Sequence, residues 1–305
     1  MDLIKEVRSK RIKATNIYPY ILIFPGLFLI CLILVYPLAR GIMSSFFAQE
    51  FMSLGLKKFI GLRQYERLAG DPSFWMTLKN TAIWVVAVVV LQYLIGLSSA
   101  LLLNRDFRGR GLFRSMILIP WVIPTIAGAL SWQWIYDFQY GVLNYILKTI
   151  NVTQRGFDWI GSVDLALPSV IAVAVWKAGP FVTVTLLAAL QAVDRQLYEV
   201  ADLDGAGMFR KFWHITMPGI KEVTITSMLL RVIWTFNQFD IVNVMTNGGP
   251  ANSSMILPVY TYLTAFSFNE LNYAAAIACV GLILIGVVGV YYVVRNSRGM
   301  GVRTR

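Results

Sequence analysis

Charged side chains are scarce in this sequence: they make up 14% of its 305 residues, whereas 57% of the residues are hydrophobic. Soluble domains average about 25% charged residues, so the chain lacks the polar surface of a water-soluble protein. We therefore predict an integral membrane protein. An all-α architecture is expected, because a membrane helix satisfies its backbone hydrogen bonds internally.

The few charges are mostly basic, and the net charge is +11. A basic balance is also typical of nucleic-acid-binding proteins. Here, however, Lys and Arg form short clusters beside apolar runs, which is the placement that orients a membrane protein. We therefore expect membrane lipid as a partner and no nucleic acid.

Residues that bind metals or phosphate are also scarce. Cys31 and Cys279 are the two cysteines, and both lie inside apolar runs, where filling the core is a better interpretation than a disulfide or a zinc site. His214 is the single histidine, which excludes a histidine-rich metal centre. No G-x-x-x-x-G-K-[ST] phosphate-binding loop occurs, so the chain is not its own P-loop ATPase. We predict no catalytic residue, metal or cofactor on this chain.

Long apolar runs predict six transmembrane helices, because each approaches or exceeds the ~20 residues that cross the hydrocarbon core. The predicted spans are about 19–39, 77–103, 113–136, 166–192, 223–245 and 273–294. The first run is too long for a signal peptide and is expected to remain as a helix. Pro120 and Pro124 are expected to kink the start of the third span. The 12-residue run 255–266 contains Pro258, is too short to cross, and is expected at the interface or against helix ends.

The distribution of Lys and Arg predicts the orientation. One side collects 17 of them and the other side six. The richer side comprises the segments 1–18, 105–114, 195–221 and 295–305. We therefore expect a cytoplasmic N-terminus (1–18), a six-helix transmembrane domain (19–294) with a cytoplasmic loop (194–221), and a cytoplasmic tail (295–305).

The polar block 199–218 interrupts two long apolar segments, and a chain this apolar has little cause to carry it unless it contacts something outside the lipid. The Asp204–Gly205 pair is a turn signal, so two short helical pieces are predicted to meet there. Pro218 is expected to end the second piece. Asp194 is expected to cap the first. An amphipathic loop on the membrane surface is the alternative interpretation.

Ionisable and amide side chains inside the spans are costly in lipid and need a reason. Lys177 lies near the middle of the fourth span and Arg231 lies in the fifth. Either these groups line a hydrophilic pathway, or they join helices through hydrogen bonds and a Lys177–Asp240 salt bridge. Three residues at three-residue spacing are expected to share one stripe of the fifth span: Asn237, Asp240 and Asn243. Trp234 lies deep enough to face a pore, with core packing as the alternative.

The spacing within 199–218 resembles the cytoplasmic signature of binding-protein-dependent ABC importer permeases. That signature reads E-A-A, three residues, G, nine residues, I-x-L-P. The matching residues here are Glu199-Val200-Ala201, Gly205 and Ile215-Thr216-Met217-Pro218. Further stretches resemble the carbohydrate branch, the relatives of the maltose and glycerol-phosphate permeases, among them FRGRGLFRSMILIPWVIP, VWKAGPF and TFNQFDIVNVMTNGGP. The resemblance covers most of residues 20–295.

This resemblance implies a type I ABC importer permease fold with six transmembrane helices, in a bacterial or archaeal inner membrane. It implies a non-catalytic subunit for sugar or oligosaccharide import. Its partners would be a second, homologous permease, two cytoplasmic ATPases that bind ATP and Mg²⁺, and an extracytoplasmic solute-binding protein. The residues assigned to ATPase coupling are Glu199, Ala201, Asp204, Gly205, Ile215 and Pro218. The alternative is an ion-gradient-driven secondary transporter or channel, which would favour inverted repeats and discontinuous helices. We see neither in the sequence.

Overall fold

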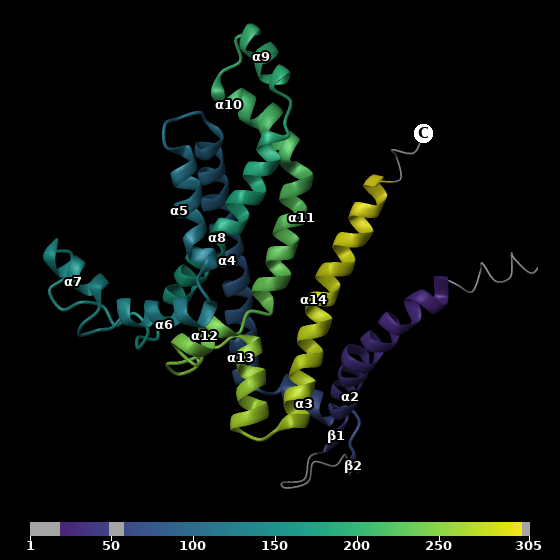
Figure 1. The fold of residues 1–305 in the computed structure, drawn as a ribbon. Helices are drawn as coiled ribbons and strands as arrows, with labels where there is room; N and C mark the ends of the chain where they lie inside the picture. Colours follow the sequence, from purple (N-terminus) through teal and green to yellow (C-terminus); the bar gives the residue numbers. More distant parts are fainter. Residues whose placement is uncertain (1–18, 49–57, 301–305) are drawn as a thin grey trace, which may run out of the picture. The chain divides into compact units, whose positions relative to one another are not determined.

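The computed structural model describes residues 19–48 and 58–300, with side chains described as far as Val294. The predicted N-terminal segment 1–18 lies outside the described residues, as does the end of the tail. The described chain is helical apart from one short two-stranded ribbon (Figure 1). It divides into two compact units, which are taken separately below.

The first unit comprises residues up to Leu68 together with Thr264–Cys279. Its helical run Pro19–Ser44 includes the π-helical turn η1 (Cys31–Val35) and α2 (Tyr36–Ser44), and it confirms the first predicted span. The apolar side chains of this run are exposed, as expected for a helix surrounded by lipid.

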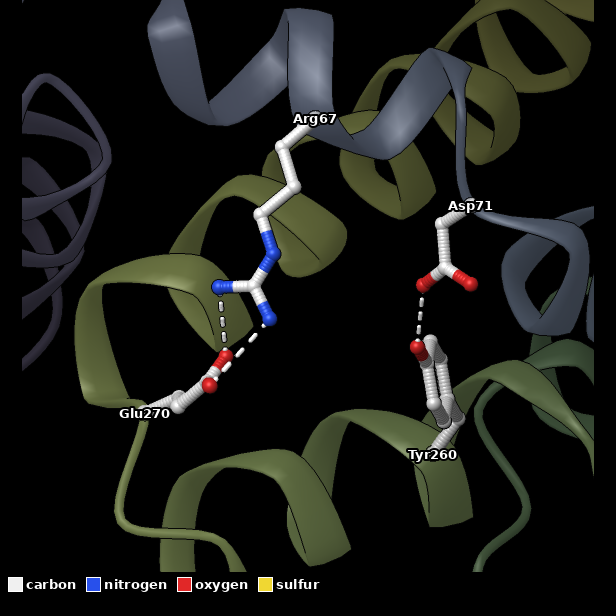
Figure 2. A network of polar contacts seen from close by, with 4 residues as sticks. All are labelled: Arg67, Asp71, Tyr260 and Glu270. Atoms are coloured by element: carbon white, nitrogen blue, oxygen red, sulfur yellow. Dashed lines mark hydrogen bonds and ion pairs between the residues drawn. The ribbon is translucent and has the colours of Figure 1, made fainter.

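Short elements of the first unit lie close to residues 264–279. The strands β1 (Phe47–Ala48) and β2 (Lys58–Phe59) pair antiparallel, and α3 (Arg63–Ala69) follows. Arg67 forms a two-bonded ion pair with Glu270, at 2.7 and 3.1 Å (Figure 2). The guanidinium of Arg67 also lies 4.0 Å from the ring centre of Tyr273, at the start of α14 (Leu271–Met300). These contacts join segments about 200 positions apart in the sequence, as the 203-residue separation of Arg67 and Glu270 shows.

The second unit comprises Ala69–Leu263 and the chain from Val280. Its centre is α4 (Pro72–Asn104) packed along α8 (Ala166–Gln191). Gly96 permits this close approach, since a Cβ there would lie 2.7 Å from Val182 Cγ1. Around this contact a core forms from Leu97, Ala100, Leu103, Val182, Leu186, Leu187, Ala189, Leu190 and Ile220.

The helix α4 begins at Pro72, earlier than the predicted start at residue 77. The carboxylate of Asp71 accepts a hydrogen bond from the Ser73 amide at 2.9 Å, and Pro72 occupies the first helical turn. Asp followed by Pro is a recognised helix start. Asp71 also accepts a hydrogen bond from the Tyr260 hydroxyl (Figure 2).

The third predicted span is not one gently kinked helix. The helices α5 (Arg110–Val122) and α6 (Thr125–Ile135) meet at 95°. The bend falls at Ile123 and Pro124, whose backbones are extended, because a residue before proline is driven out of the helical region. Pro120, by contrast, lies inside α5. The following loop contains α7 (Val142–Thr149).

The fifth predicted span is also broken. The helix α11 (Met217–Phe236) ends at Asn237, and α12 (Asp240–Met245) begins after a gap. The short run at 255–266 forms α13 (Leu257–Tyr262) and the π-turn η3 (Leu263–Ser267). As expected, it packs rather than crosses: the Leu257 amide donates to Thr81 Oγ1 of α4 at 2.8 Å.

Within the described residues, four helices are long and apolar enough to cross a membrane, and the bent α5–α6 pair makes a fifth if it counts as one span. The four are Pro19–Ser44, Pro72–Asn104, Ala166–Gln191 and Leu271–Val294. The one remaining crossing, the fifth in chain order, requires α11, which is not among these helices. The 20 residues of α11 include the charged residues Lys221, Glu222 and Arg231.

Candidate functional site

The polar block begins with α9 (Arg195–Leu203), beyond the ends of α8 and α11 (Figure 1). Asp194 caps α9 as predicted, accepting from the Gln196 amide at 2.9 Å. The helix ends in a Schellman motif: the Ala206 amide donates to the Ala201 carbonyl at 2.8 Å, and the Gly205 amide donates to the Asp202 carbonyl at 3.1 Å. The turn at Asp204–Gly205 is therefore where the sequence predicts it.

Gly205 has φ +71°, a left-handed conformation that strains residues with a side chain. A Cβ at this position would have no neighbouring atom within 4 Å. The requirement for glycine is therefore set by the backbone and not by packing.

The second helical piece does not end at Pro218, contrary to the sequence prediction. The helix α10 (Met208–Lys211) continues through the π-turn η2 (Phe212–Thr216) directly into α11. The Met217 amide bonds to the Phe212 carbonyl five residues back. Pro218 lies inside this continuous helix, two residues after the π-turn, so its missing N–H falls where the regular i→i−4 pattern is already interrupted. The block and α11 therefore form one helical path.

Two side-chain contacts join α9 to this path across the Gly205 turn. Lys211 Nζ lies 2.5 Å from Asp202 Oδ1. The hydroxyls of Tyr198 and Thr216 lie 2.9 Å apart. A cavity of about 360 Å³ lies beside them, closed on one side by Leu101 and Arg105 of α4 and its following loop.

The outer surface of the block combines acidic and apolar groups. Of the coupling candidates, Glu199, Asp204, Gly205 and Pro218 are exposed, and Ala201 and Ile215 are half-buried. Large apolar side chains are exposed beside them, with Leu203 88% and Phe209 82% accessible. Further exposed apolar side chains are Leu197, Val200, Met208 and Trp213. Large apolar side chains exposed together with charged groups are typical of an interaction site.

Lys177 does not pair with Asp240 in the part of the chain that the structure describes. The Lys177 side chain is buried, and its Nζ donates to the Trp121 carbonyl of α5 at 3.0 Å. This carbonyl lies one residue before the end of α5, where helical carbonyls lack internal partners. The predicted salt bridge is wrong, and a helix-joining hydrogen bond takes its place.

Arg231 lies at the centre of a buried network that joins α4, α8 and α11. Its Nε donates to Gln92 Oε1 at 2.8 Å, and Gln92 Nε2 donates to the Ala174 carbonyl at 2.9 Å. Arg231 also reaches Thr235 Oγ1 at 3.4 Å. Gln92 is fully buried, and the sequence reasoning did not single it out. The signal available in the sequence was the side-chain amide of Gln92 in the middle of an apolar run.

The predicted stripe of three polar residues does not exist on one helix. Asn237 is the C-cap of α11 and its side chain bonds the Ile233 carbonyl, whereas Asp240 and Asn243 belong to α12. Asp240 is exposed, and the Asn243 Oδ1 atom is buried without a hydrogen-bond partner among the described residues. Trp234 is 48% exposed and packs edge-on against Phe181, with ring centres 5.3 Å apart. No cluster of three or more metal-ligating side chains occurs among the described residues.

A largely helical membrane protein with an exposed block of charged and apolar side chains fits a subunit that binds a partner outside the lipid. This chain belongs to the binding-protein-dependent transport system inner membrane component family, which matches residues 92–299. It is a multi-pass permease subunit of an ABC importer, and not the subunit that hydrolyses ATP. The resemblance that the sequence suggested is confirmed.

Relatives are similar over most of their length. The chain is 36% identical to the sulfoquinovosyl glycerol transport system permease SmoG of Agrobacterium fabrum, over 85% of this chain and 84% of that protein. It is 35% identical to the trehalose/maltose transport system permease MalF of Thermococcus litoralis, over 87% and 89%. A chain of a bacterial alginate ABC transporter, solved with a periplasmic protein that holds an alginate pentasaccharide, has the same fold at a TM-score of 0.79 and 18% identity, covering 92% of this chain and 94% of that one.

Proposed function

We propose that this chain forms half of the transmembrane pathway of a saccharide importer. It crosses a bacterial or archaeal inner membrane six times, with α11 as the fifth crossing helix in chain order and both termini in the cytoplasm. A second, homologous permease completes the pathway. Two ABC ATPases hold ATP and Mg²⁺ in the cytoplasm, and an extracytoplasmic binding protein delivers the solute.

The saccharide assignment is supported by what the relatives carry. SmoG is named for sulfoquinovosyl glycerol, MalF for trehalose and maltose, and the structural relative binds alginate through its periplasmic protein. All of these solutes are built from sugars. Because a fold hosts many functions, the two relatives above 30% identity carry more of this argument than the shared fold does.

The observation that carries the coupling assignment is the unbroken helical path from α10 through η2 into α11. A force applied to α10 reaches a bundle helix without passing a loop. Glu199 and Asp204 supply negative charge on the exposed side, with the apolar Leu203 and Phe209 close in sequence. A groove on an ATPase with basic and apolar residues fits this surface.

ATP-driven closure of the ATPases would move this block and shift the helix bundle between two orientations. Gly205 gives the block its turn. Ala201 receives the Schellman hydrogen bond, and Ile215 and Pro218 shape the entry into α11.

For the solute pathway we propose Trp234, Asn237, Asp240 and Asn243. They flank the break between α11 and α12, where helical hydrogen bonding is interrupted and polar backbone groups become available. Trp234, Asn237 and Asp240 are exposed in the single chain, and the buried Asn243 Oδ1 atom has no hydrogen-bond partner within the described part of the chain. Lys177 contributes differently, since its ammonium group donates a hydrogen bond to the Trp121 backbone carbonyl. It holds α5 against α8 beside the pathway.

The test is the variant Gly205→Asp in the whole transporter, reconstituted with its binding protein. The side chain strains the left-handed turn, so the protein is expected to insert normally while solute-stimulated ATP hydrolysis falls at least tenfold. A panel of labelled trehalose, maltose, sulfoquinovosyl glycerol and alginate oligosaccharides measures uptake. Normal stimulation of ATP hydrolysis in Gly205→Asp would refute the coupling assignment, and uptake of none of the four sugars would refute the proposed solute class.

A further inference from the structure

The polar block 199–218 has a structural weakness at its turn. Three small residues, Gly205-Ala206-Gly207, separate α9 from α10. The Schellman motif fixes the chain only as far as Ala206, because its last hydrogen bond is the one from that amide. Glycine at 207 leaves the next backbone torsions free. Something else must therefore set the angle between α9 and the helical path into α11.

The two side-chain contacts described above supply that constraint. Asp202 is the second-to-last residue of α9 and Lys211 is the last residue of α10, nine residues apart. Tyr198 lies one turn earlier, and its hydroxyl meets Thr216 at the end of η2, 18 residues on. The contacts are thus two rungs between antiparallel helical segments. The two contacts are about one helical turn apart on each segment. Because they hold the segments together at two points, they fix the angle between them.

We infer that Asp202 and Lys211 are positioning residues for energy coupling. Their ion pair holds α9 at a set angle to α11, so that movement of α9 is transmitted to the bundle and not absorbed at Gly205–Gly207. This inference rests on the proposed role of the block as the contact to the ATPase. Neither residue is needed to touch the ATPase for the effect.

The two rungs differ in a way that makes the inference testable. The Asp202–Lys211 rung is partly solvated, with 62% of the aspartate side chain accessible, whereas Thr216 is buried. A partly solvated ion pair is weakened by salt. A hydroxyl pair is not. Coupling should therefore weaken with ionic strength in the wild type, and this dependence should vanish when the ion pair is removed.

The experiment is a charge-exchange cycle on the assembled transporter in nanodiscs, with ATP as the probe. The variants are Asp202→Lys, Lys211→Asp and the double exchange. Each single variant places like charges together, so the maximal rate of binding-protein-stimulated ATP hydrolysis should fall about two- to fivefold, with KM for ATP unchanged. The double exchange should restore at least half of the loss. The quantity of ATPase subunit that co-purifies should stay constant.

Arg210→Asp serves as the matched control, because it changes the same charge one residue earlier. Its combination with Asp202→Lys should show no rescue. Equal rescue by the 210 and 211 exchanges would mean that net charge matters and would overturn the inference. The inference would also be overturned if the single variants showed the same stimulated ATP hydrolysis as the wild type while Gly205→Asp was uncoupled. That result would leave the proposed coupling role of the block intact. If Gly205→Asp is not uncoupled either, the coupling role itself fails.

Discussion

Two networks of charged side chains join helices in this chain, and their surroundings are opposite. The Arg231–Gln92 network lies among buried residues of α4, α8 and α11. The Asp202–Lys211 pair lies on the exposed block beyond those helices. Groups in the buried network have few alternative hydrogen-bond partners, so each lost hydrogen bond leaves an unsatisfied polar group. The exposed pair can exchange its bonds for water, so it can orient a segment without determining whether the chain folds.

The largest expected effect comes from breaking the buried network at Gln92. Gln92→Leu removes the acceptor for Arg231 and leaves a buried cation without it, at a cost of about 3–5 kcal/mol. Arg231→Met leaves the neutral side-chain oxygens of Gln92 and Thr235 without this donor, at about 1–3 kcal/mol. The double variant should be less damaging than Gln92→Leu alone. Thermal unfolding of the purified complex, followed by tryptophan fluorescence, ranks the three.

Gln191→Leu makes the same chemical change at an exposed position at the end of α8, and we expect a change within about 0.5 kcal/mol. If Gln92→Leu unfolded at the same temperature as this control, Arg231 would have another adequate partner and the buried network would be incidental.

The second effect concerns the packing that surrounds the buried network. Gly96→Ala places a Cβ 2.7 Å from Val182 Cγ1 and should destabilise the α4–α8 pair by about 1–3 kcal/mol. Gly286→Ala in α14 is the matched control, since a Cβ there has no neighbour within 4 Å. Melting temperatures of the two variants provide the comparison. If the melting temperatures of both variants fell equally, the added Cβ at position 96 would be accommodated by a shift of α4 away from α8 that costs nothing.

The sequence predicted the exposed block better than the buried network. The Asp194 cap, the two helical pieces and the turn at Asp204–Gly205 follow from local rules, because each depends on residues within a few positions. Gln92 and its bond to Arg231 depend on positions 139 apart, and only the fold brings them together. A local pattern could mark Gln92 as unusual but could not name its partner.

The failed predictions share a physical cause. The stripe of Asn237, Asp240 and Asn243 assumed a continuous helix, and the helix breaks at Asn237. Pro218 was expected to end a helix, but the helix continues through it, because the π-turn before it interrupts the i→i−4 pattern where proline lacks an N–H. The bend at Ile123–Pro124 follows a known local rule whose angle depends on packing. The apolar runs of the sequence locate the membrane-spanning segments well, but they say little about where the helices within those segments break.

The smallest expected effect tests whether the exposed block depends on one backbone torsion. Gly205→Ala forces a side chain into φ +71° and should cost about 1–2 kcal/mol, although no atom obstructs it. Gly207→Ala is the control: its φ of −66° suits any residue, and the loss of a good N-cap residue offsets the entropic gain, so the free energy of unfolding should change by less than about 0.5 kcal/mol. Gly205→Asn should fall between them, because Asn tolerates the left-handed region.

Hydrogen exchange of the Gly205 and Ala206 amides measures the difference directly, since both close the Schellman motif. Protection should fall in Gly205→Ala and persist in Gly207→Ala. If the two alanine variants lost protection equally, the turn would depend on glycine's flexibility and not on its left-handed conformation. The block would then be a hinge, and the Asp202–Lys211 pair would carry more of its orientation than the backbone does.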